Sequence, residues 1–435
     1  MERTLIKNIP EKKNKDIIVK GWVQDFRNLN KLKFIILRDR TGLGQLIALK
    51  DETPQDIYEK ITDLPQETVI EVKGLVVENK QSRFGYEVQI KDIKIITKAK
   101  TPMPIDNSDK SNTTIDKRTD YRFLDTRNVK HSARYKVRGK ITRILTDFFE
   151  KEGFTNIQTS KLTKIGVESG AELFKVNYFG DSVYLSQSPQ VYKQMFVAGG
   201  FERVFEIGPV FRAEKSNTTR HLTEFTGVDF EMGFIENMSD VMDLIEEMIK
   251  DLITNLKTAA KDELELLQIE LNIPEKIPRI TMKEAKKILK EKGKELTEED
   301  DLDSEAERML GEYAKEEHKT DFIFITKYPW AVRPFYHMRP DDNREETESF
   351  DLLYNGVEIA TGAQREHRLE ILDAQAKEKG LNLNEMEKYK EIFEYGMPPH
   401  GGAGFGLDRI TQRLLGLDNV REVVLLPRDP DRKTP

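Results

Sequence analysis

Charged side chains of both signs surround a single aromatic residue, Phe225, between residues 202 and 233. Two apolar segments there predict the strands of a hairpin, and the loop between them is rich in Lys, Arg, Asn and Thr. Arginine forks bind phosphate, a ring stacks on a base, and carboxylates bind polar edges or metals, so the pattern predicts a site for a planar, polyanionic ligand. The alternative is a solvated edge hairpin. The charged residues concerned are Arg212, Glu214, Arg220, His221 and the pair Asp229 and Glu231, which alternation puts on one strand face.

A second group of reactive side chains lies in the stretch FDLLYNGVEIATGAQREHR, residues 350–368. Asp351 and Glu358 flank Asn355-Gly356, a dipeptide typical of tight hairpin turns. A hairpin there brings the two carboxylates together, and such a pair binds Mg²⁺ when phosphates and water supply the remaining ligands. Two solvated acids on a surface strand are the alternative interpretation.

A third group lies in QSPQVYKQ, residues 187–194. Ser188-Pro189 favours the start of a helix, and helical spacing puts Gln190, Lys193 and Gln194 on one face. A lone lysine on a helix is usually solvated, so this face does not indicate a site without further support.

The stretch GMPPHGGAGFGLDRITQRLL, residues 396–415, is rich in glycine and runs into a predicted helix. Glycine lets a backbone approach phosphate closely, and Arg409 lies in the first turn of that helix. The stretch does not match the GxxxxGK[ST] pattern, which argues against a P-loop ATPase.

The elements that position these groups belong to a chain of 435 residues, 37% of them hydrophobic, so a sizeable core can form. This length suggests about two to three domains. The absence of cysteine excludes disulfides and thiolate metal sites. No apolar run reaches the roughly 18 residues of a membrane span, and the N-terminal stretch lacks the apolar segment of a signal peptide, so we expect a cytoplasmic protein with no membrane contact. A net charge of −7 argues against a surface that is positive throughout, although 70 Lys and Arg residues allow a local basic face.

The pattern of elements predicts a multidomain α/β protein. Residues 1–102 contain short strands with a helix after the third, which predicts an OB-fold barrel of the kind that binds single-stranded nucleic acid. The polar segment 103–130 predicts a hinge. Residues 131–435 are expected to form a mixed α/β body that begins with an amphipathic helix over 131–152. Within that body we expect a helical insertion at about 239–325, with no chemistry of its own.

Several of these stretches together resemble a known family. FRAE, RHL, EF and VDFEM in the charged hairpin resemble motif 2 of the class II aminoacyl-tRNA synthetases, in its aspartyl form. GAGFGLDRI at 402–410 resembles motif 3, and QSPQVYKQ at 187–194 resembles the aspartyl-specific amino-acid loop. The motifs occur in the family's order, and the similarity continues to the terminal PRDPDRKTP. The resemblance is to the archaeal and eukaryotic-like type (class IIb), which implies an OB-fold anticodon-binding domain followed by a catalytic antiparallel sheet flanked by helices.

The resemblance implies which residues bind ATP and metal. Arg212 is expected to hold the α-phosphate and Arg409 the γ-phosphate, which makes these two the catalytic residues, while Phe225 stacks on the adenine. Mg²⁺ is expected as the cofactor, held by Asp351, Glu358 and Thr361, the last at a position that is often serine. The other residues placed at the nucleotide are Glu214, Arg220, His221, Leu222, Glu358, Gly406, Leu407 and Asp408.

The resemblance also implies an aspartate site. Lys193 and Arg365 match the positions that contact the side-chain carboxylate, and Glu168 matches the residue that binds the amino group. Two positive charges favour aspartate over asparagine, because a buried cationic pair that faces an amide loses its pairing energy. The remaining expected contacts with aspartate are Gln190, Arg212 and Thr361.

For tRNA, the resemblance implies that the barrel binds the anticodon. The positions of Phe34 and Gln45 contact its bases, and those of Gln24 and Arg83 affect the choice between tRNA(Asp) and tRNA(Asn). Gln24 matches neither pattern expected for the two kinds of enzyme, so the sequence leaves open whether tRNA(Asn) is charged too. The predicted helix over 131–152 and the strand after it resemble motif 1, which implies a homodimer. Ser160 stands in place of the family's proline in that strand.

The implied reaction activates L-aspartate with ATP to aspartyl-adenylate and pyrophosphate, and then transfers aspartate to the 3′ end of tRNA(Asp). The substrate's own α-carboxylate attacks the α-phosphate, so catalysis consists of positioning and charge neutralisation. An asparaginyl-tRNA synthetase is the nearest alternative, and Lys193 and Arg365 speak against it. Intact Arg212, Glu358 and Arg409 speak against a non-catalytic RNA-binding relative, and the retained barrel speaks against a free-asparagine synthetase.

Overall fold

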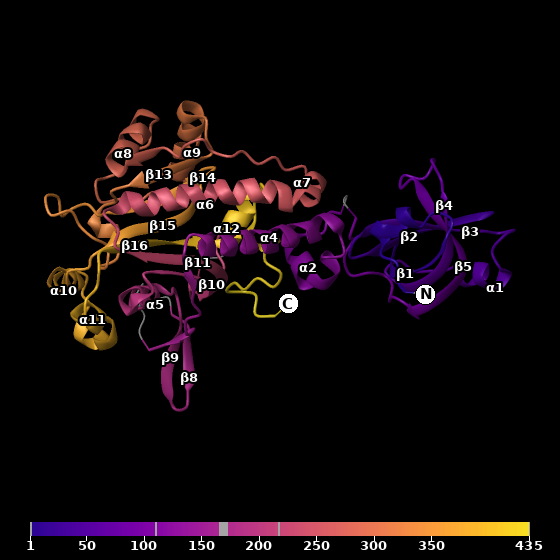
Figure 1. Cartoon of the computed structure of the whole chain (residues 1–435), viewed down its shortest axis with the longest axis horizontal. Coiled ribbons are helices and arrows are strands. Elements are labelled where there is room, and N and C mark those ends of the chain that lie inside the picture. The colour runs from indigo at the N-terminus through magenta and orange to yellow at the C-terminus, as the bar shows by residue number, and fades with distance from the viewer. Residues whose placement is uncertain (1, 109–110, 165–172, 216–217, 435) are drawn as a thin grey trace. The chain divides into compact units, whose positions relative to one another are not determined.

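A computed structural model describes residues 2–108, 111–164, 173–215 and 218–434 (Figure 1). The chain divides into two compact units, Met1–Asp106 and Asn107–Pro435. Among the described residues, no helix combines the length and the apolar character needed to cross a membrane.

The first unit is a closed five-stranded barrel in the order β1-β2-β3-β5-β4. Alternation along the strands turns Val19, Ile35 and Val72 into the barrel, where each is fully buried. A short helix, α1, follows the third strand, so the predicted OB-fold is confirmed. The strands are β1 (Asp16–Leu29), β2 (Leu32–Asp39), β3 (Gly42–Leu49), β4 (Val69–Glu78) and β5 (Tyr86–Thr97), with α1 at Gln55–Lys60.

The segment 103–130, predicted as a hinge, contains the helices α2 (Ile115–Asp120) and α3 (Arg122–Asp125). The buried Arg122 donates hydrogen bonds to the carbonyl oxygens of Arg421 at 2.8 Å and Leu425 at 3.1 Å. These bonds tie α3 to the C-terminal segment, so from Asn107 onward the segment is part of the second unit.

The second unit is built on an eight-stranded sheet in the order β12-β13-β14-β15-β16-β11-β10-β6. The ladders that join β13 to β14, β15, β16, β11 and β10 in succession are antiparallel, while β6 and β12 pair in parallel at the two edges. The strands are β6 (Thr155–Asn156), β10 (Arg203–Phe211), β11 (Glu224–Gly233), β12 (Arg279–Thr281), β13 (Phe322–Thr326), β14 (Ser349–Tyr354), β15 (Glu358–Arg365) and β16 (His400–Gly406).

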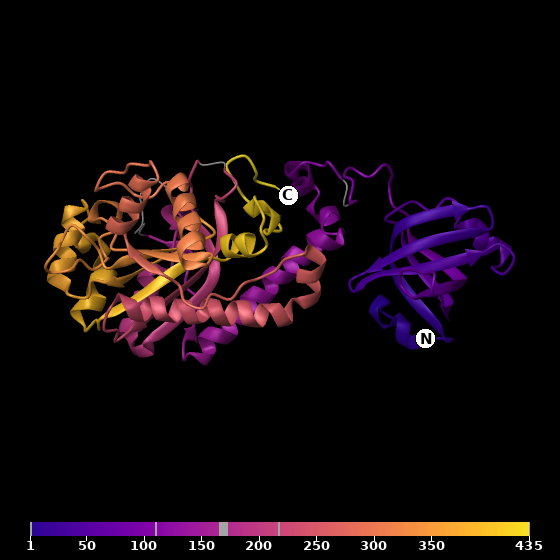
Figure 2. The ribbon, with the colours of Figure 1, turned by 90° about the horizontal axis from the view of Figure 1, so that it is seen from above.

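Two long helices, α4 (Val129–Lys151) and α6 (Met238–Ala259), lie side by side along the sheet (Figures 1 and 2). The predicted apolar stripe of α4 is buried, with Val137, Ile141 and Phe149 at the centre of the core. Asn237 caps α6, because its side chain accepts a hydrogen bond from the main-chain N–H of Ser239 and Asp240 reaches back to complete a capping box. The antiparallel sheet with flanking helices confirms the predicted fold class.

The insertion expected at about 239–325 is only partly helical. It contains α6, α7 (Lys261–Leu267), α8 (Met282–Glu291) and α9 (Ser304–His318), but it also supplies β12 and β13 of the main sheet. The alternating residues of β13 are buried on both faces, so its sequence lacks the period of a surface strand. The remaining helices are α5 (Gln190–Phe196), α10 (Leu369–Glu378), α11 (Glu387–Glu394) and α12 (Leu407–Leu414).

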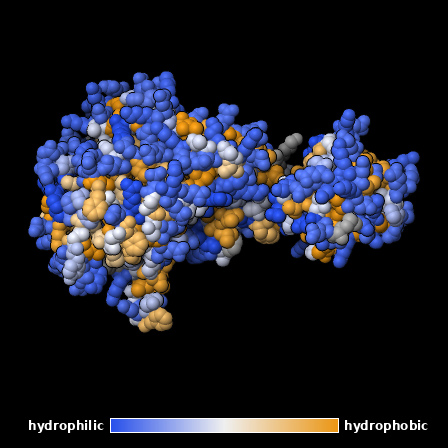
Figure 3. Space-filling model, viewed as in Figure 1, coloured by the Kyte–Doolittle hydropathy of each residue, from blue (hydrophilic) through white to orange (hydrophobic). Residues whose placement is uncertain are grey.

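A small three-stranded sheet, β7-β9-β8, carries a hairpin that projects from the second unit (Figure 1). Its strands are β7 (Leu162–Thr163), β8 (Lys175–Tyr178) and β9 (Asp181–Leu185). The face of the protein in Figure 3 is mainly hydrophilic, with hydrophobic residues in scattered patches. Phe179 at the hairpin tip is 96% exposed.

Candidate active site

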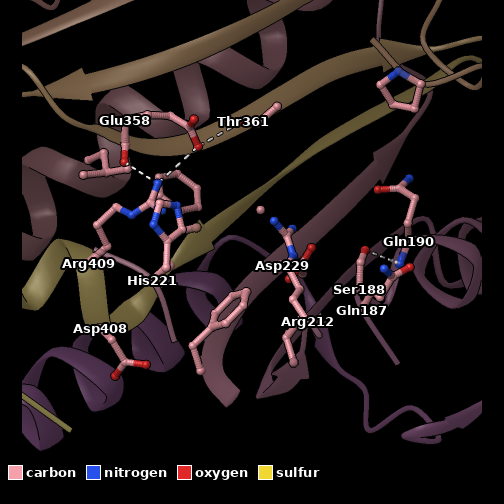
Figure 4. Close-up of a pocket in the computed structure, with 18 of the residues that line it drawn as sticks. Gln187, Ser188, Gln190, Arg212, His221, Asp229, Glu358, Thr361, Asp408 and Arg409 are labelled. Carbon is pink, nitrogen blue, oxygen red and sulfur yellow. Dashed lines mark hydrogen bonds and ion pairs between the residues drawn. The ribbon is translucent and has the colours of Figure 1, made fainter. Parts of the chain in front are cut away.

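A pocket with a volume of about 390 Å³ opens on the sheet of the second unit, where α5 and α12 meet β11, β15 and β16 (Figure 4). The structure brings together most of the residues that the sequence placed at ATP and aspartate. Those that line the pocket are Gln190, Lys193, Arg212, Glu214, Arg220, His221, Leu222, Phe225, Glu358, Thr361, Arg365, Gly406, Asp408 and Arg409.

The hairpin β10–β11 supplies the aromatic floor of the pocket. Its register pairs Val210 with Phe225, and the Arg212 guanidinium lies over the Phe225 ring at 5.5 Å from the ring centre. Glu214 lies 3.7 Å from Arg212 and is its ion-pair partner. A flat cation and an aromatic face stacked in this way are suited to a nucleotide, whose base stacks on the ring while its phosphate pairs with the guanidinium.

A cluster of opposite charges forms the end of the pocket, where α5 faces β11. The Lys193 ammonium lies 3.1 Å from Asp229 and 3.3 Å from Glu231. The predicted alternation is therefore confirmed, since both carboxylates lie on one face of β11. Two glycines on the neighbouring strand β16 leave room for these carboxylates. If each carried a Cβ, that atom would lie 2.4 Å from Glu231 Oε2 at Gly402 and 3.0 Å from Asp229 Oδ1 at Gly404.

Arg365, at the end of β15, shares this cluster. Its Nε donates to Glu231 Oε1 at 2.9 Å, and its Nη2 donates to the Gly402 carbonyl at 3.0 Å and to Gln190 Oε1 at 3.3 Å. Glu231 is fully buried, which by itself would raise the pKa of its carboxyl, but Arg365 and Lys193 hold that pKa below its ordinary value. The carboxylate therefore stays ionised and shared by both cations.

His337 completes the surroundings of Arg365. Its Nε2 lies 2.9 Å from Arg365 Nη1, and the residue is only 2% exposed. Burial, followed by the nearby Arg365 charge, lowers the pKa of this imidazole well below 6.5, so it is neutral at pH 7. No local pattern marks His337 as a site residue, because a single histidine in FYHM has no motif around it.

The predicted metal site lies on the hairpin β14–β15. The turn at Asn355-Gly356 forms as expected, with a positive φ at both residues, and it places Thr361 directly opposite Asp351. Residues three apart face opposite sides of a regular strand, yet Thr361 Oγ1 donates to Glu358 Oε1 at 3.4 Å. An irregularity in the ladder at Leu352–Leu353 accounts for this contact, since a bulge re-aims the side chains beyond it.

The same hairpin has the chemistry that a divalent cation requires. Burial and the neighbouring Asp351 raise the pKa of Glu358. Asp351 Oδ2 accepts from Arg333 at 2.7 Å, whereas its Oδ1 is buried with no hydrogen-bond partner among the described residues. A cation bound to Asp351 Oδ1 would supply the missing partner and would relieve the repulsion between the carboxylates of Asp351 and Glu358. In the described part of the chain, no three His, Cys, Asp or Glu side chains gather to hold a metal alone, so phosphate oxygens would have to complete its shell.

Arg409 approaches the hairpin from the first turn of α12. Its Nη1 donates to the Glu358 carbonyl at 2.9 Å and lies 3.5 Å from Glu358 Oε1 (Figure 4). In the same view His221 lies beside these two residues, while Gln190 lies at the opposite end of the pocket. The pocket thus has one end with Arg409 and His221 and an opposite end with Gln190 and Lys193.

The insertion contributes a carboxylate that the sequence analysis missed. Glu307 on α9 lies 3.2 Å from Arg220, which comes from the loop between β10 and β11. Burial, and then the charge of Glu358, raise the pKa of Glu307 to about 7. The helix can pack this closely on the β14–β15 turn because residue 311 is glycine. A Cβ at this position would lie 2.4 Å from Gly356 N, which is too close for any other residue.

Leu407 and Asp408, two further residues predicted to lie at the nucleotide, also have contacts within the fold. Leu407 does not line the pocket, because its side chain is 1% exposed and packs in the core. Asp408 borders the pocket, but its two oxygens accept from Arg138 Nε at 2.7 Å and from the Thr226 main-chain N–H at 2.9 Å. Both residues therefore hold α12 in place. Glu168 lies outside the described residues.

The predicted anticodon residues lie on the first unit. Phe34 and Gln45 are half-buried, on the adjacent paired strands β2 and β3. Gln24 accepts a hydrogen bond from Arg38, which pairs with Glu67 at 2.6 Å. Arg83 is exposed and lies over the Phe84 ring, 4.6 Å from its centre.

Comparison with known families identifies both units. Residues 114–430 match the family described as class II tRNA synthetases (D, K and N), and residues 17–96 match the OB-fold nucleic acid binding domain. The chain belongs to the class II tRNA synthetases. This class II synthetase is 45% identical to the aspartate–tRNA(Asp) ligase of Pyrococcus abyssi, over 98% of this chain and 97% of that one.

Three further proteins match nearly the whole chain. The synthetase is 44% identical to the aspartate–tRNA(Asp/Asn) ligase of Aeropyrum pernix, over 95% of this chain and 94% of that one. Among solved structures, it superposes on the asparaginyl-tRNA synthetase of Pyrococcus horikoshii in complex with asparaginyl-adenylate, with a TM-score of 0.94 at 31% identity and full coverage of both chains. It also superposes on the aspartyl-tRNA synthetase of Entamoeba histolytica, with a TM-score of 0.90 at 31% identity, over 100% of this chain and 93% of that one.

Proposed function

We propose that this synthetase is an aspartate–tRNA ligase. It activates L-aspartate with ATP and passes the aspartyl group to tRNA(Asp). The observation that carries the proposal is the pair of buried cations, Lys193 and Arg365, at one end of a pocket whose other end carries Arg409. The relatives named as aspartate–tRNA ligases support it, since they match nearly the whole chain.

The cationic end of the pocket selects the amino acid in this proposal. Lys193 and Arg365 bind the side-chain carboxylate, while Glu168 is proposed to bind the amino group. Because the counter-ions Glu231 and Asp229 already balance the two cations, a bound carboxylate is held by hydrogen bonds that an amide cannot match. Gln190 contributes its Nε2 donor, which is buried with no partner among the described residues.

The nucleotide end positions ATP for attack. Phe225 stacks on the adenine, Arg212 pairs with the α-phosphate and Arg409 with the γ-phosphate, with Glu214, Arg220, His221 and Leu222 around them. An oxygen of the aspartate α-carboxylate then forms a bond to the α-phosphorus, while the bond from that phosphorus to the bridging oxygen breaks and pyrophosphate leaves. No protein nucleophile is required, and Arg212 offsets the charge that develops on the α-phosphate.

Mg²⁺ is the proposed cofactor, held by Asp351 and Glu358 with Thr361 beside them. When bound, it would neutralise phosphate charge and fix the β- and γ-phosphates. The unpartnered Oδ1 of Asp351 and the raised pKa of Glu358 support this set of ligands.

The OB-fold barrel is proposed to bind the anticodon through Phe34 and Gln45, with Gln24 and Arg83 nearby. Aromatic side chains on a barrel surface stack bases, and exposed arginine pairs with phosphate. The domain limits that we propose are 1–102 for this unit, 103–130 for the connecting segment and 131–435 for the catalytic unit.

A homodimer formed through α4 and β6 is also proposed. β6 is the outermost strand of the main sheet, where a partner can pack. Ser160, in place of the proline, bonds locally instead: its hydroxyl donates to the Leu162 carbonyl at 2.9 Å. As an enzyme of translation without a membrane-spanning helix among the described residues, the synthetase is proposed to act in the cytoplasm.

Charging of purified tRNA transcripts tests the proposal. We expect the enzyme to attach labelled aspartate to tRNA(Asp), and no asparagine to either tRNA. Attachment of asparagine to tRNA(Asn) would contradict the assignment of the amino acid. The same assay with aspartate and tRNA(Asn) decides between the two kinds of ligase found among the relatives.

A further inference from the structure

We propose that His337 is a positioning residue that determines specificity for the amino acid, because it supplies a neutral hydrogen-bond acceptor to Arg365. The inference rests on the proposed aspartate site and adds to it a residue that none of the motifs contains. Its basis is the contact between His337 Nε2 and Arg365 Nη1, 2.9 Å long and fully enclosed in the pocket wall.

The main chain fixes His337 against the end of β15. His337 and Arg365 form an isolated antiparallel bridge, and the neighbouring Met338 N–H donates to the Gln364 carbonyl at 3.0 Å. On the other side, Gln375 Nε2 donates to the His337 carbonyl at 3.0 Å. Because the backbone is held on both sides, the imidazole has little freedom to move away from the guanidinium.

The contact determines the protonation state of the imidazole. An arginine side chain can only donate hydrogen bonds, so His337 Nε2 must accept and its proton must reside on Nδ1. Nδ1 is buried and has no hydrogen-bond partner among the described residues. Within that part of the chain, the imidazole therefore bonds through Nε2, to Arg365. An imidazolium would point an N–H at the guanidinium and add a third positive charge beside Lys193.

Neutrality matters because the charges of the pocket are already balanced. The cations Lys193 and Arg365 face the carboxylates of Asp229 and Glu231. Glu231 accepts hydrogen bonds from one edge of the Arg365 guanidinium, at 2.9 Å from Nε and 3.4 Å from Nη2. A carboxylate on the opposite edge would give Arg365 a second counter-ion and make the pocket anionic. The imidazole instead orients the guanidinium without adding a second counter-ion, so the pocket stays balanced and does not repel the carboxylate of the substrate.

The test compares three variants in which only the acceptor changes. His337→Gln keeps a neutral acceptor, His337→Leu removes the acceptor, and His337→Glu replaces it with an anion. Because Gln and Glu have nearly the same size, the pair separates charge from packing. The readouts are kcat and KM for aspartate and for ATP in ATP–pyrophosphate exchange, the ratio of aspartate to asparagine activation, and the Tm of each variant.

We expect His337→Gln to keep the KM for aspartate within about threefold of the wild type. His337→Leu should raise that KM roughly tenfold with little change in kcat or in the KM for ATP, because a buried donor loses its acceptor. His337→Glu should lower kcat/KM for aspartate about 100-fold and reduce the preference over asparagine, because the anion both occupies Arg365 and repels the substrate.

Equal aspartate kinetics for the Gln and Glu variants would overturn the proposal, even if the Leu variant failed to fold. So would a loss of Tm in all three variants with no change in the KM for aspartate, which would indicate a purely structural histidine. Absence of exchange with aspartate in the wild type is a different result, since it would reject the proposed function itself.

Discussion

Arg220 Nη1 lies 3.2 Å from Glu307 Oε2, so a helix of the insertion contacts the loop of the nucleotide-binding hairpin. The Arg220 guanidinium also donates to Ser304 Oγ at 3.1 Å, at the start of α9. An arginine proposed to bind ATP is thus anchored by residues 84 and 87 positions away in the sequence. The insertion therefore takes part in the architecture of the active site.

Replacement of Glu307 by Gln should weaken ATP binding. At pH 8, above the Glu307 pKa of about 7, the loop arginine loses an ionised partner. A partly exposed pair of this kind contributes about 0.5–1 kcal/mol, so we expect the KM for ATP at that pH to rise about two- to fivefold. The KM for aspartate should not change. Arg308→Gln is the matched control, since its exposed side chain on the same helix pairs only with Glu312 in the described structure. Equal ATP kinetics for the two variants would contradict the anchoring role.

Replacement of Arg212 by Ala should abolish activation of the amino acid. Arg212 is the cation stacked on Phe225, and loss of one group that stabilises charge in the transition state lowers kcat about 10²–10³-fold. The measurement is ATP–pyrophosphate exchange, with Arg308→Ala as the control because its side chain is 59% exposed on α9. Near-normal adenylate formation by Arg212→Ala would refute the assignment of this residue.

Replacement of Lys193 by Met should reduce the preference for aspartate. Without the ammonium group, Arg365 alone faces Asp229 and Glu231, so the pocket becomes anionic and repels the substrate carboxylate. We expect the ratio of kcat/KM for aspartate to that for asparagine to fall at least tenfold, since one buried charge–charge interaction is worth more than about 1.4 kcal/mol. Lys250→Met, which removes an ion pair with Glu246 on α6 outside the pocket, should leave the ratio unchanged.

The buried His400 makes stability depend on pH. Burial lowers the pKa of His400 to about 4, whereas the unfolded chain titrates near 6.5, so the unfolded state binds more protons between these values. The free energy of unfolding is therefore unaffected by His400 above pH 6.5. As pH falls toward 4, the unfolded state takes up a proton that the folded state does not, and the free energy of unfolding falls by about 3 kcal/mol in total.

Thermal unfolding of His400→Gln and wild type between pH 7 and pH 5 measures this effect. The Tm of the wild type should fall more steeply than that of the variant. His318→Gln, at an exposed position on α9, should retain the wild-type slope. Parallel slopes for all three proteins would contradict a buried neutral His400.

Local patterns were sufficient to predict the elements that carry most of the site. Alternation in β11 put Asp229 and Glu231 on one face, and the Asn355-Gly356 dipeptide predicted the β14–β15 turn, both of which the structure confirms. Helical spacing likewise predicted that Gln190 and Lys193 face the same side of α5. These features depend on neighbours within a few residues, which is the range that sequence periodicity reports.

Other parts of the site depend on contacts between distant segments and could not be predicted. The approach of Glu307 requires Gly311 and Gly356 to pack backbone against backbone, and neither glycine has a local signal of that role. The orientation of Glu358 depends on an irregularity in the β14–β15 ladder, and the role of His337 depends on a bridge to Arg365. The packing of Leu407 in the core and the hydrogen bonds from Arg138 and Thr226 to Asp408 are likewise contacts between distant segments, and the motif alone does not predict them.

ATP–pyrophosphate exchange with the purified synthetase and each amino acid in turn tests the central claim most directly. We predict exchange with L-aspartate alone, because Lys193 and Arg365 pair with a side-chain carboxylate in the proposed site. Exchange with asparagine in place of aspartate would contradict the amino-acid assignment while leaving the fold intact. No exchange with any amino acid, even with tRNA present, would contradict the proposed activity as a whole.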